Sequence, residues 1–213
     1  IMEAESQGKT ALGGPHTRAA ARAMAVMHVS NSMGIVCAAP TGGAAGTIPG
    51  VVTTLAAEQA LGPEQIALSL FAASAIGLIV AMRATFAAET AGCQVEVTAA
   101  GAMAAAAVVE AAAGTAWQAA DAAAITFHNG MGLVCDTVRG GCEIPCHTRN
   151  AVAASSAFAC ADLVMGGYEN PISLDDTVDA VLAVGEMLPA ELRCTSRGGI
   201  AVTPSARALP ASR

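Results

Sequence analysis

The sequence predicts an all-α fold, a globular array of packed Ala-rich helices joined by Gly/Pro-rich and Cys-bearing loops. Long apolar stretches dominated by alanine are separated by short breaks rich in glycine and proline. No segment shows the clean polar–apolar alternation that is typical of a half-buried strand. The chain is 54% hydrophobic but only 3% aromatic, so small side chains would let neighbouring helices approach closely. Together these observations indicate tightly packed helices around a core.

Seven helices are expected in chain order, and polar, Gly or Pro residues mark their ends. Thr17, Thr115 and Ser173 are placed to cap three of them, because a side-chain hydroxyl can accept a hydrogen bond from a first-turn amide. Acidic residues follow Ser173 and favour the start of the last helix. The expected helices cover residues 18–31, 51–61, 64–88, 94–113, 116–128, 151–165 and 173–188.

A length of 213 residues suits one large domain with a core of its own. We expect this domain to span residues 1–213, with the polar residues 1–12 as a disordered segment or the end of a fragment, since the chain starts at Ile1. The N-terminus shows no succession typical of a secretion signal. We therefore expect a cytoplasmic protein, whose seven cysteines stay reduced and serve metal binding or catalysis rather than disulfides.

The charge balance argues against nucleic acid as a partner. The formal net charge is -7, whereas a nucleic-acid-binding protein normally presents a basic surface. Only 13% of the residues are charged, which is low for an exposed monomer. This composition indicates a surface that is covered in part by a partner domain, a subunit interface or both.

The mean hydropathy of +0.54 raises the question of a membrane. The longest uncharged run extends from Gln65 to Met82 and is close to the length of about 20 residues that a membrane-spanning helix needs. Because the run contains polar and many small residues, we interpret it as a buried core helix. We expect no membrane association.

The residues that carry chemistry gather between Cys135 and Asn150. This irregular segment holds three thiols, two acids, two arginines and a Gly-Gly pair, whereas the chain on both sides is Ala-rich and apolar. Polar loops on a rigid scaffold often carry function.

Cys93, Cys135 and Cys146 each lie in or beside a loop at a helix end. Three thiolates from separate loops could hold an iron–sulfur cluster or a zinc ion, and three ligands would leave one coordination position open. The alternative is that a cysteine serves as a small apolar core residue, as expected for Cys37 and Cys160. Spacing alone leaves both interpretations open, because the chain has no C-x-x-C pair.

Several other kinds of site are disfavoured by the sequence. The glycines of residues 42–46 match no phosphate-binding loop, and no nucleophile elbow is present. Pyridoxal phosphate requires a Schiff-base lysine, and Lys9 lies in a polar tail. Among the histidines, His147 and His16 are the better site candidates, whereas His28 and His128 fall within expected helices.

Four ordered motifs carry a resemblance to the α domain of iron–sulfur-dependent L-serine dehydratases. The resemblance extends from Gly13 to Leu209, nearly the whole chain. The matching residues are Pro40, Thr41, Gly43, Gly46, Pro49 and Gly50; Gly92, Cys93, Gln94, Glu96 and Val97; Cys135, Asp136, Val138, Gly140, Pro145, Cys146, Arg149 and Asn150; and Thr195, Ser196, Arg197, Gly198 and Gly199.

The resemblance implies a [4Fe-4S] cluster bound by Cys93, Cys135 and Cys146, with one iron free to act on substrate. It also implies deamination of L-serine, a small amino acid, to pyruvate and ammonia. A β subunit or domain and a homo-oligomer are the implied partners.

The substrate carboxylate has two expected holders. The loop of Thr41, Gly42 and Gly43 offers backbone amides, and Arg149 with Asn150 offers a fork of donors. The catalytic base is not identified by the sequence. His147 and His16 are the candidates for it.

The chain also departs from the family pattern, which leaves alternatives open. One is a related iron–sulfur lyase acting on another β-substituted amino acid, such as a cysteine desulfidase. Another is a non-catalytic helical protein with a structural cluster or zinc ion, and a third is a membrane protein. The departing residues are His28, Ser30, Thr137, Cys142 and Cys194.

Overall fold

The computed structural model describes residues 1–210, and the all-α prediction is confirmed over that range. The described residues form helices, turns and a single isolated bridge between Cys135 and Arg193, with no sheet. Residues 211–213 of the expected domain lie outside the described part. The α-helices are α1 Met2–Ser6, α2 Pro15–Asn31, α3 Thr47–Glu58, α4 Pro63–Arg83, α5 Ala88–Ala91, α6 Val97–Ala111, α7 Ala116–Gly130, α8 Cys146–Met165, α9 Leu174–Met187 and α10 Pro204–Ala208.

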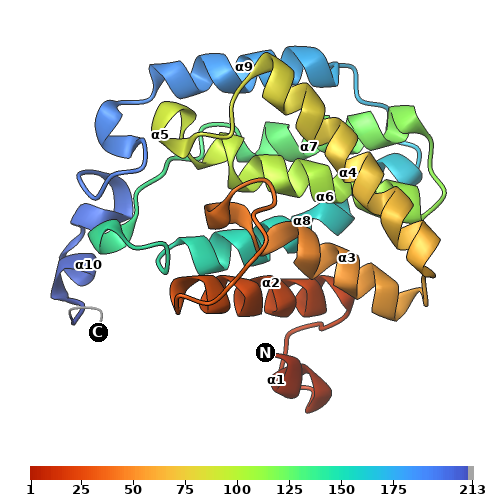
Figure 1. Ribbon diagram of the computed structural model, residues 1–213, viewed down its shortest axis with the longest axis horizontal. Helices are drawn as coiled ribbons and strands as arrows, with labels where there is room; N and C mark the ends of the chain where they lie inside the picture. The colour runs from red at the N-terminus through yellow and green to blue at the C-terminus, as the bar shows by residue number, and fades with distance from the viewer. Residues whose placement is uncertain (211–213) are drawn as a thin grey trace.

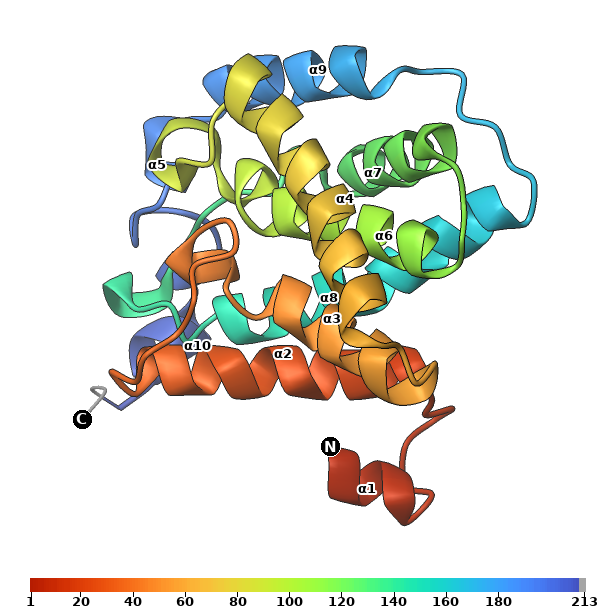
Figure 2. The same cartoon turned by 45° about the vertical axis from the view of Figure 1, so that its right-hand side comes forward.

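Helix α6 is the centre of the fold, and α3, α4, α7 and α8 pack around it (Figures 1 and 2). Every residue from Val97 to Val109 is buried. A helix that is apolar on all sides must be surrounded by other helices, and the alanines of α6 allow that by keeping its diameter small. The expectation of closely packed Ala-rich helices is confirmed.

Two of the three predicted caps are present. The hydroxyl of Thr115 accepts a hydrogen bond from Gln118 N at the start of α7, and that of Ser173 accepts one from Asp176 N at the start of α9. The third prediction is wrong, because α2 begins at Pro15 rather than after Thr17. Proline is favoured at the first helical position, where its missing N–H has no helical partner in any case.

Several helix boundaries differ from those expected, including those of α3, which covers Thr47–Glu58 rather than residues 51–61. Helix α4 ends at Arg83 instead of continuing to residue 88, and the chain then turns so that Phe86 packs against the core. The expected helix over 94–113 is divided into a 3₁₀ turn (η2, Cys93–Val95) and α6. Helix α8 begins at Cys146, five residues before the expected start, so that the last part of the chemically rich segment is helical.

Helix α4 is not the fully buried core helix that was expected. One face packs on α6, but Leu68, Phe71, Leu78 and Met82 are exposed on the other. By length and composition, Pro63–Arg83 and Cys93–Ala111 could each cross a membrane, and the second of these stretches is 89% buried in the fold whereas the first is 28% buried. The outward face of α4 is therefore apolar without a partner in the described structure.

The N-terminal residues form a short helix that lies apart from the packed helices (Figure 2). Glu5 of α1 accepts hydrogen bonds from Gly14 N and from Arg18, and Arg18 also pairs with Glu58 of α3. These contacts hold α1 at the start of α2. One expectation for residues 1–12 was disorder, whereas the structure places residues 2–6 in a helix.

Candidate active site and metal centre

The structure brings two of the three predicted thiol ligands together. Cys93 lies in the turn η2 before α6, Cys135 lies in the loop after α7, and both are buried. Their sulfur atoms and a carboxylate oxygen of Glu96 all lie within 4.8 Å of one another. Segments 42 residues apart in the sequence thus contribute donor atoms to one small volume.

Cys146, the third predicted ligand, is the first residue of α8 and is also buried. Its thiol is hydrogen-bonded to that of Cys142, and the negative charges of Cys93 and Glu96 act on it through space. The three predicted ligands therefore share one region, although Cys146 stands outside the tight group formed by Cys93, Glu96 and Cys135.

The thiols lie in two pairs, Cys93 with Cys135 and Cys142 with Cys146, and the members of each pair shift each other's pKa in opposite directions. The hydrogen bond from Cys135 lowers the pKa of Cys93, and the nearby Arg149 lowers it further, while the same bond and burial raise the pKa of Cys135. In the second pair, the bond with Cys146 lowers the pKa of Cys142 to about 7, and the pKa of Cys146 is raised. Because thiolates are the species that bind metal, the lowered pKa of Cys93 and of Cys142 favours metal binding at each pair.

The donor set suits a thiol-bound metal. Buried sulfur ligands select zinc or iron–sulfur clusters over hard cations such as magnesium or calcium. Cys194 adds a further thiol, which is hydrogen-bonded to Cys135, and burial raises the pKa of Cys194. Five of the seven cysteines therefore surround the same region, and all seven are free thiols.

Arg149 links the thiols to the rest of the site. Its Nη1 atom lies 3.6 Å from Cys93 Sγ and donates to Val134 O at 2.8 Å, and its Nη2 atom donates to Asp136 Oδ1 at 2.8 Å. Although burial lowers the pKa of Arg149, the charges of Cys93 and Asp136 raise it overall. The guanidinium thus supplies a fixed positive charge beside the thiols.

The C-terminal turn holds the Cys135 loop in place. Cys135 exchanges backbone hydrogen bonds with Leu192 and Thr195, and the Ser196 hydroxyl donates to Thr137 O and accepts from Gly140 N. The predicted Thr195–Gly199 motif is therefore part of the site as a clamp. Cys194 adopts a left-handed backbone conformation, with φ of 58°, within this clamp.

The Thr41 loop faces Glu96. Thr41 Oγ1 donates to Glu96 Oε1 at 2.5 Å, and Cys93 Sγ lies 4.0 Å from Glu96 Oε2. A Cβ atom at Gly43 would lie 2.6 Å from the same carboxylate, so that only glycine allows this approach. Burial raises the pKa of Glu96, although the Thr41 hydrogen bond lowers it in part.

Asn150 joins this loop to α8. Its side chain accepts from Gly46 N and Thr47 Oγ1 and donates to Gly43 O and Cys146 O. The residue is fully buried, and all four hydrogen-bonding positions of its amide are used. The structure thus gives Asn150 a positioning role, and contact with a substrate carboxylate stays a prediction for it.

The two candidate histidines occupy different places. His147 Nε2 lies 2.8 Å from Asn31 Nδ2 at the end of α2, and its ring faces that of His28. His16 lies near the opposite end of α2, about 20 Å along the helix from Asn31 at 1.5 Å per residue. The structure therefore brings His147 next to the Cys142–Cys146 loop but does not bring His16 there.

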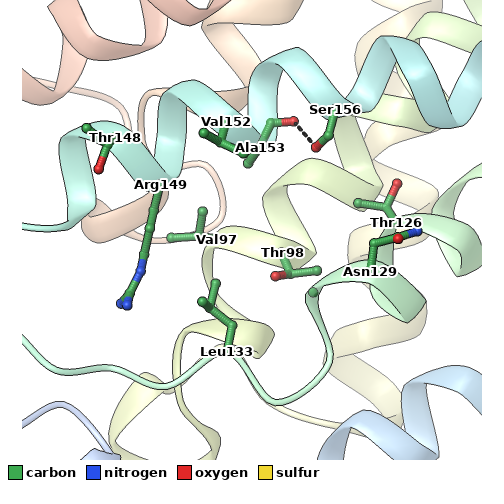
Figure 3. A pocket seen from close by; sticks show the side chains of 11 residues that line it. Val97, Thr98, Thr126, Asn129, Leu133, Thr148, Arg149, Val152, Ala153 and Ser156 are labelled. Carbon is green, nitrogen blue, oxygen red and sulfur yellow. Dashed lines mark hydrogen bonds between the residues drawn. The ribbon is translucent and has the colours of Figure 1, made fainter. Parts of the chain in front are cut away.

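A cavity of about 380 Å³ lies between α6, α7 and α8, and Figure 3 shows side chains that line it. Arg149 lines the cavity and also touches Cys93, so the cavity adjoins the proposed metal ligands. Its volume suits a small molecule. The side chains labelled in Figure 3 are Val97, Thr98, Thr126, Asn129, Leu133, Thr148, Arg149, Val152, Ala153 and Ser156.

Sequence reasoning assigned no role to two members of this site. Glu96 was part of a recognised motif without a stated role, and nothing in the sequence placed Cys194 beside Cys135. Cys142 was recognised as an extra thiol in the Cys135–Asn150 segment, but its pairing with Cys146 was not predicted. Of the two cysteines expected in the core, Cys160 is buried as predicted, but Cys37 is exposed because its segment runs over the surface. His128 is hydrogen-bonded to Thr177, as expected of a structural histidine.

The described residues form an all-helical fold, and separate loops bring buried thiols together within it. The chain is therefore a helical protein with a thiol-rich candidate metal site. Comparison with known families is more specific: the chain belongs to the serine dehydratase alpha chain family, whose model matches residues 2–201.

Individual relatives cover most of the chain. It is 44% identical over 204 residues to a probable L-serine dehydratase alpha chain of Bacillus subtilis, covering 95% of this chain and 67% of the relative. The corresponding protein of Latilactobacillus sakei is 44% identical over 187 residues, 88% of this chain and 90% of the relative. An L-serine dehydratase of Mycobacterium tuberculosis is 36% identical over 185 residues, which are 84% of this chain but only 40% of that protein.

Proposed function

We propose that this chain is the catalytic α chain of an L-serine dehydratase, which converts L-serine to pyruvate and ammonia. The observation that carries the proposal is the placement of Cys93, Cys135 and Cys146 around Arg149 and Glu96, in a chain 44% identical to proteins named L-serine dehydratase alpha chain.

The proposed cofactor is a [4Fe-4S] cluster bound by Cys93, Cys135 and Cys146. When bound, such a cluster supplies a Lewis acid that makes the β-hydroxyl of serine a better leaving group. Support for it comes from the sulfur donors, their burial and the pKa of Cys93, which Cys135 and Arg149 lower from its ordinary value.

The protein groups have separate tasks in this proposal. The positive charge of Arg149 and the amides of Gly42 and Gly43, which open a 3₁₀ turn and have no partner within it, orient the substrate carboxylate. The Glu96 carboxylate is the proposed acceptor of the α-proton, because Thr41 fixes its Oε1 atom while Oε2 faces Cys93. His147 remains the alternative.

The reaction balances without a redox step. The base takes the proton of the Cα–H bond, the Cβ–O bond breaks, and the departing hydroxyl takes up one proton and leaves as water, so that no net proton is gained or lost. The resulting enamine tautomerises and reacts with water, which releases ammonia and leaves pyruvate. Burial of the thiols and of the Asp136–Arg149 pair limits the access of bulk water to the reacting atoms.

A second chain belongs to the proposal. The names of the relatives include "alpha chain", which supports a β chain as the partner, and the M. tuberculosis relative is a longer protein of which this chain matches 40%. A cytoplasmic location, where thiols stay reduced, and the absence of membrane association are also proposed.

The test begins with anaerobic reconstitution of the purified chain with iron and sulfide, with and without a β chain. Pyruvate formation from L-serine in proportion to bound cluster would support the proposal. Comparison with L-threonine and L-cysteine identifies the substrate, and sulfide release from cysteine without pyruvate from serine would contradict the assignment.

The ligands are tested by single substitutions to serine. Cys93→Ser, Cys135→Ser and Cys146→Ser should each lose the visible absorbance of the cluster, whereas Cys160→Ser should keep it, because Cys160 lies in the main core. Equal cluster content in all four variants would refute the ligand set.

A further inference from the structure

The tight group formed by Cys93, Glu96 and Cys135 has the size of a site for a single metal ion. Its two sulfur atoms and one carboxylate oxygen all lie within 4.8 Å of one another, and Cys93 Sγ lies 4.0 Å from Glu96 Oε2. In a tetrahedral zinc site, Zn–S distances of about 2.3 Å and Zn–O distances of about 2.0–2.2 Å separate neighbouring donor atoms by about 3.5–3.8 Å. A small inward movement of these side chains would therefore complete three corners of a tetrahedron around one ion.

Cys194 supplies a fourth donor for such an ion. Its thiol is hydrogen-bonded to that of Cys135, and the backbone keeps the two residues together, because Cys135 N donates to Leu192 O and Cys135 O accepts from Thr195 N. Cys194 is exposed whereas Cys93 and Cys135 are buried, so it gives an ion a route from solvent into the group. The chain departs from the family pattern at Cys194, and the resemblance therefore assigns this thiol no role.

The carboxylate of Glu96 is already oriented as a ligand. Thr41 Oγ1 donates to Glu96 Oε1 at 2.5 Å, which leaves Oε2 as the oxygen that faces Cys93. Hydrogen bonds of this kind fix the direction of a ligand in metal sites. Glu96 can therefore present one oxygen to the ion, as carboxylates do in known zinc sites.

Arg149 supports a thiolate at Cys93. Its Nη1 atom lies 3.6 Å from Cys93 Sγ, while its Nη2 atom pairs with Asp136. A cationic donor beside a thiol favours the charged form of the sulfur, which is the form that binds metal. When Zn²⁺ binds, the three thiols release their protons to solvent and the ion offsets two of the negative charges, so no electron transfer is involved.

The types of donor favour zinc. Magnesium and calcium take oxygen ligands, whereas a tetrahedral and sulfur-rich set is typical of zinc or of iron–sulfur clusters. The cluster proposed above uses Cys146, which stands outside the tight group. With Cys194 in its place, the donors suit one small ion. Four protein ligands would close the site, as in structural zinc sites, and leave no open position for a substrate.

We propose that the cluster-free chain binds one Zn²⁺ ion through Cys93, Cys135, Cys194 and Glu96, and that this ion excludes the cluster. Exclusion follows because Cys93 and Cys135 are also two of the three proposed cluster ligands. The inference goes beyond the proposed function, and only the exclusion depends on the proposed cluster. Zinc binding itself is measured without cluster or substrate.

Anaerobic titration of the reduced, metal-free chain with Co²⁺ and then with Zn²⁺ tests the site. Cobalt substitutes for zinc as a spectroscopic probe, because a tetrahedral site gives intense visible bands and each thiolate adds charge-transfer absorption. We expect one cobalt ion per chain with three thiolates, and its displacement by one equivalent of zinc. Cys194→Ser and Glu96→Gln should each weaken zinc binding by more than about tenfold, since even the loss of a residue that only supports a ligand costs about 10- to 100-fold. An octahedral cobalt spectrum, or unchanged zinc affinity in Cys194→Ser, would overturn the proposal.

Cys146→Ser is the matched control, because Cys146 is a proposed cluster ligand that stands outside the tight group. This variant should keep the cobalt spectrum and the zinc affinity but lose the cluster, whereas Cys194→Ser should lose zinc and keep the cluster. A cobalt spectrum that depends on Cys146 and not on Cys194 would overturn the ligand set. Helical circular dichroism verifies that both variants fold.

The exclusion is tested by adding one equivalent of zinc before reconstitution with iron and sulfide. Zinc should suppress the cluster absorbance of the wild type, and Cys194→Ser should relieve the suppression. Equal cluster content with and without zinc in the wild type would overturn the exclusion. If the chain takes up no cluster at all, the proposed cofactor and the exclusion fail together, while the cobalt titration still decides the zinc site.

Discussion

The Asp136 carboxylate lies 2.8 Å from Nη2 of Arg149, and its side chain is only 2% exposed. Its other oxygen accepts a hydrogen bond from Ile200 N at 2.7 Å, while Arg149 reaches Cys93 with Nη1. This one carboxylate therefore connects the C-terminal turn, the Cys135 loop and helix α8. Because Asp136 directly follows Cys135, a proposed metal ligand, the link from this carboxylate to the ligand is short and rigid.

Removing the Asp136 carboxylate should be strongly destabilising. Asp136→Ala leaves the half-buried Arg149 guanidinium without its partner, and breaking a buried pair in this way costs about 3–5 kcal/mol. Urea unfolding measures the free energy. Arg83→Ala is the control, because its pairs with Asp175 and Asp179 are exposed and should contribute about 1 kcal/mol or less. Similar losses in both variants would contradict the role assigned to Asp136.

The turn at Gly199 should tolerate no side chain. Its φ is +59°, and an added Cβ would lie 2.1 Å from Asp136 Oδ2. We expect Gly199→Ala to lose more than about 3 kcal/mol, from left-handed strain of about 1–2 kcal/mol and the displacement of Asp136. Gly132→Ala is the matched control, since Gly132 also has a positive φ but open space around it, and it should lose only the strain. Equal losses in thermal or urea unfolding would show that the contact with Asp136 is unimportant.

The hydroxyl group of Thr41 should be required for full activity. Thr41→Val removes the hydrogen bond to Glu96 while nearly keeping the shape, and a bond to a charged group contributes about 1.5–3 kcal/mol. We expect kcat/KM for L-serine to fall by about 10- to 150-fold, with unchanged cluster absorbance. Thr41→Ser keeps the hydroxyl and should stay close to the wild type. A Val variant as active as the Ser variant would argue against Glu96 as the oriented base.

The two cysteines outside the thiol site should differ in reactivity. Cys160 is buried, and burial raises the pKa of its thiol, so both access and thiolate content are low. Cys37 is exposed. In metal-free protein, a disulfide reagent followed by peptide mass spectrometry should modify Cys37 in the native state and Cys160 only after unfolding. Rapid native modification of Cys160 would show that the α8 core opens readily.

Local sequence signals predicted most helices because their causes are local. Thr115 and Ser173 cap their own helices within three residues, and the Ala-rich stretch of α6 allows burial on all sides. The predicted helix boundaries were wrong where contacts with residues far away in the sequence set the end of a helix. Helix α4 ends where Phe86 turns into the core, and α8 starts early, which places Asn150 where it can bind Gly46 from another part of the chain.

The sequence by itself determined the fold class, the family and the three thiols that we assign to the metal, since each depends on residue types in a recognisable order. Only the tertiary structure decided that Glu96 lies between Thr41 and Cys93, that Cys194 lies against Cys135, and that α4 leaves an apolar face exposed. The physical reason is that these relationships join segments far apart in the chain. Their closeness depends on how α6 is packed by its neighbours, which no local pattern records.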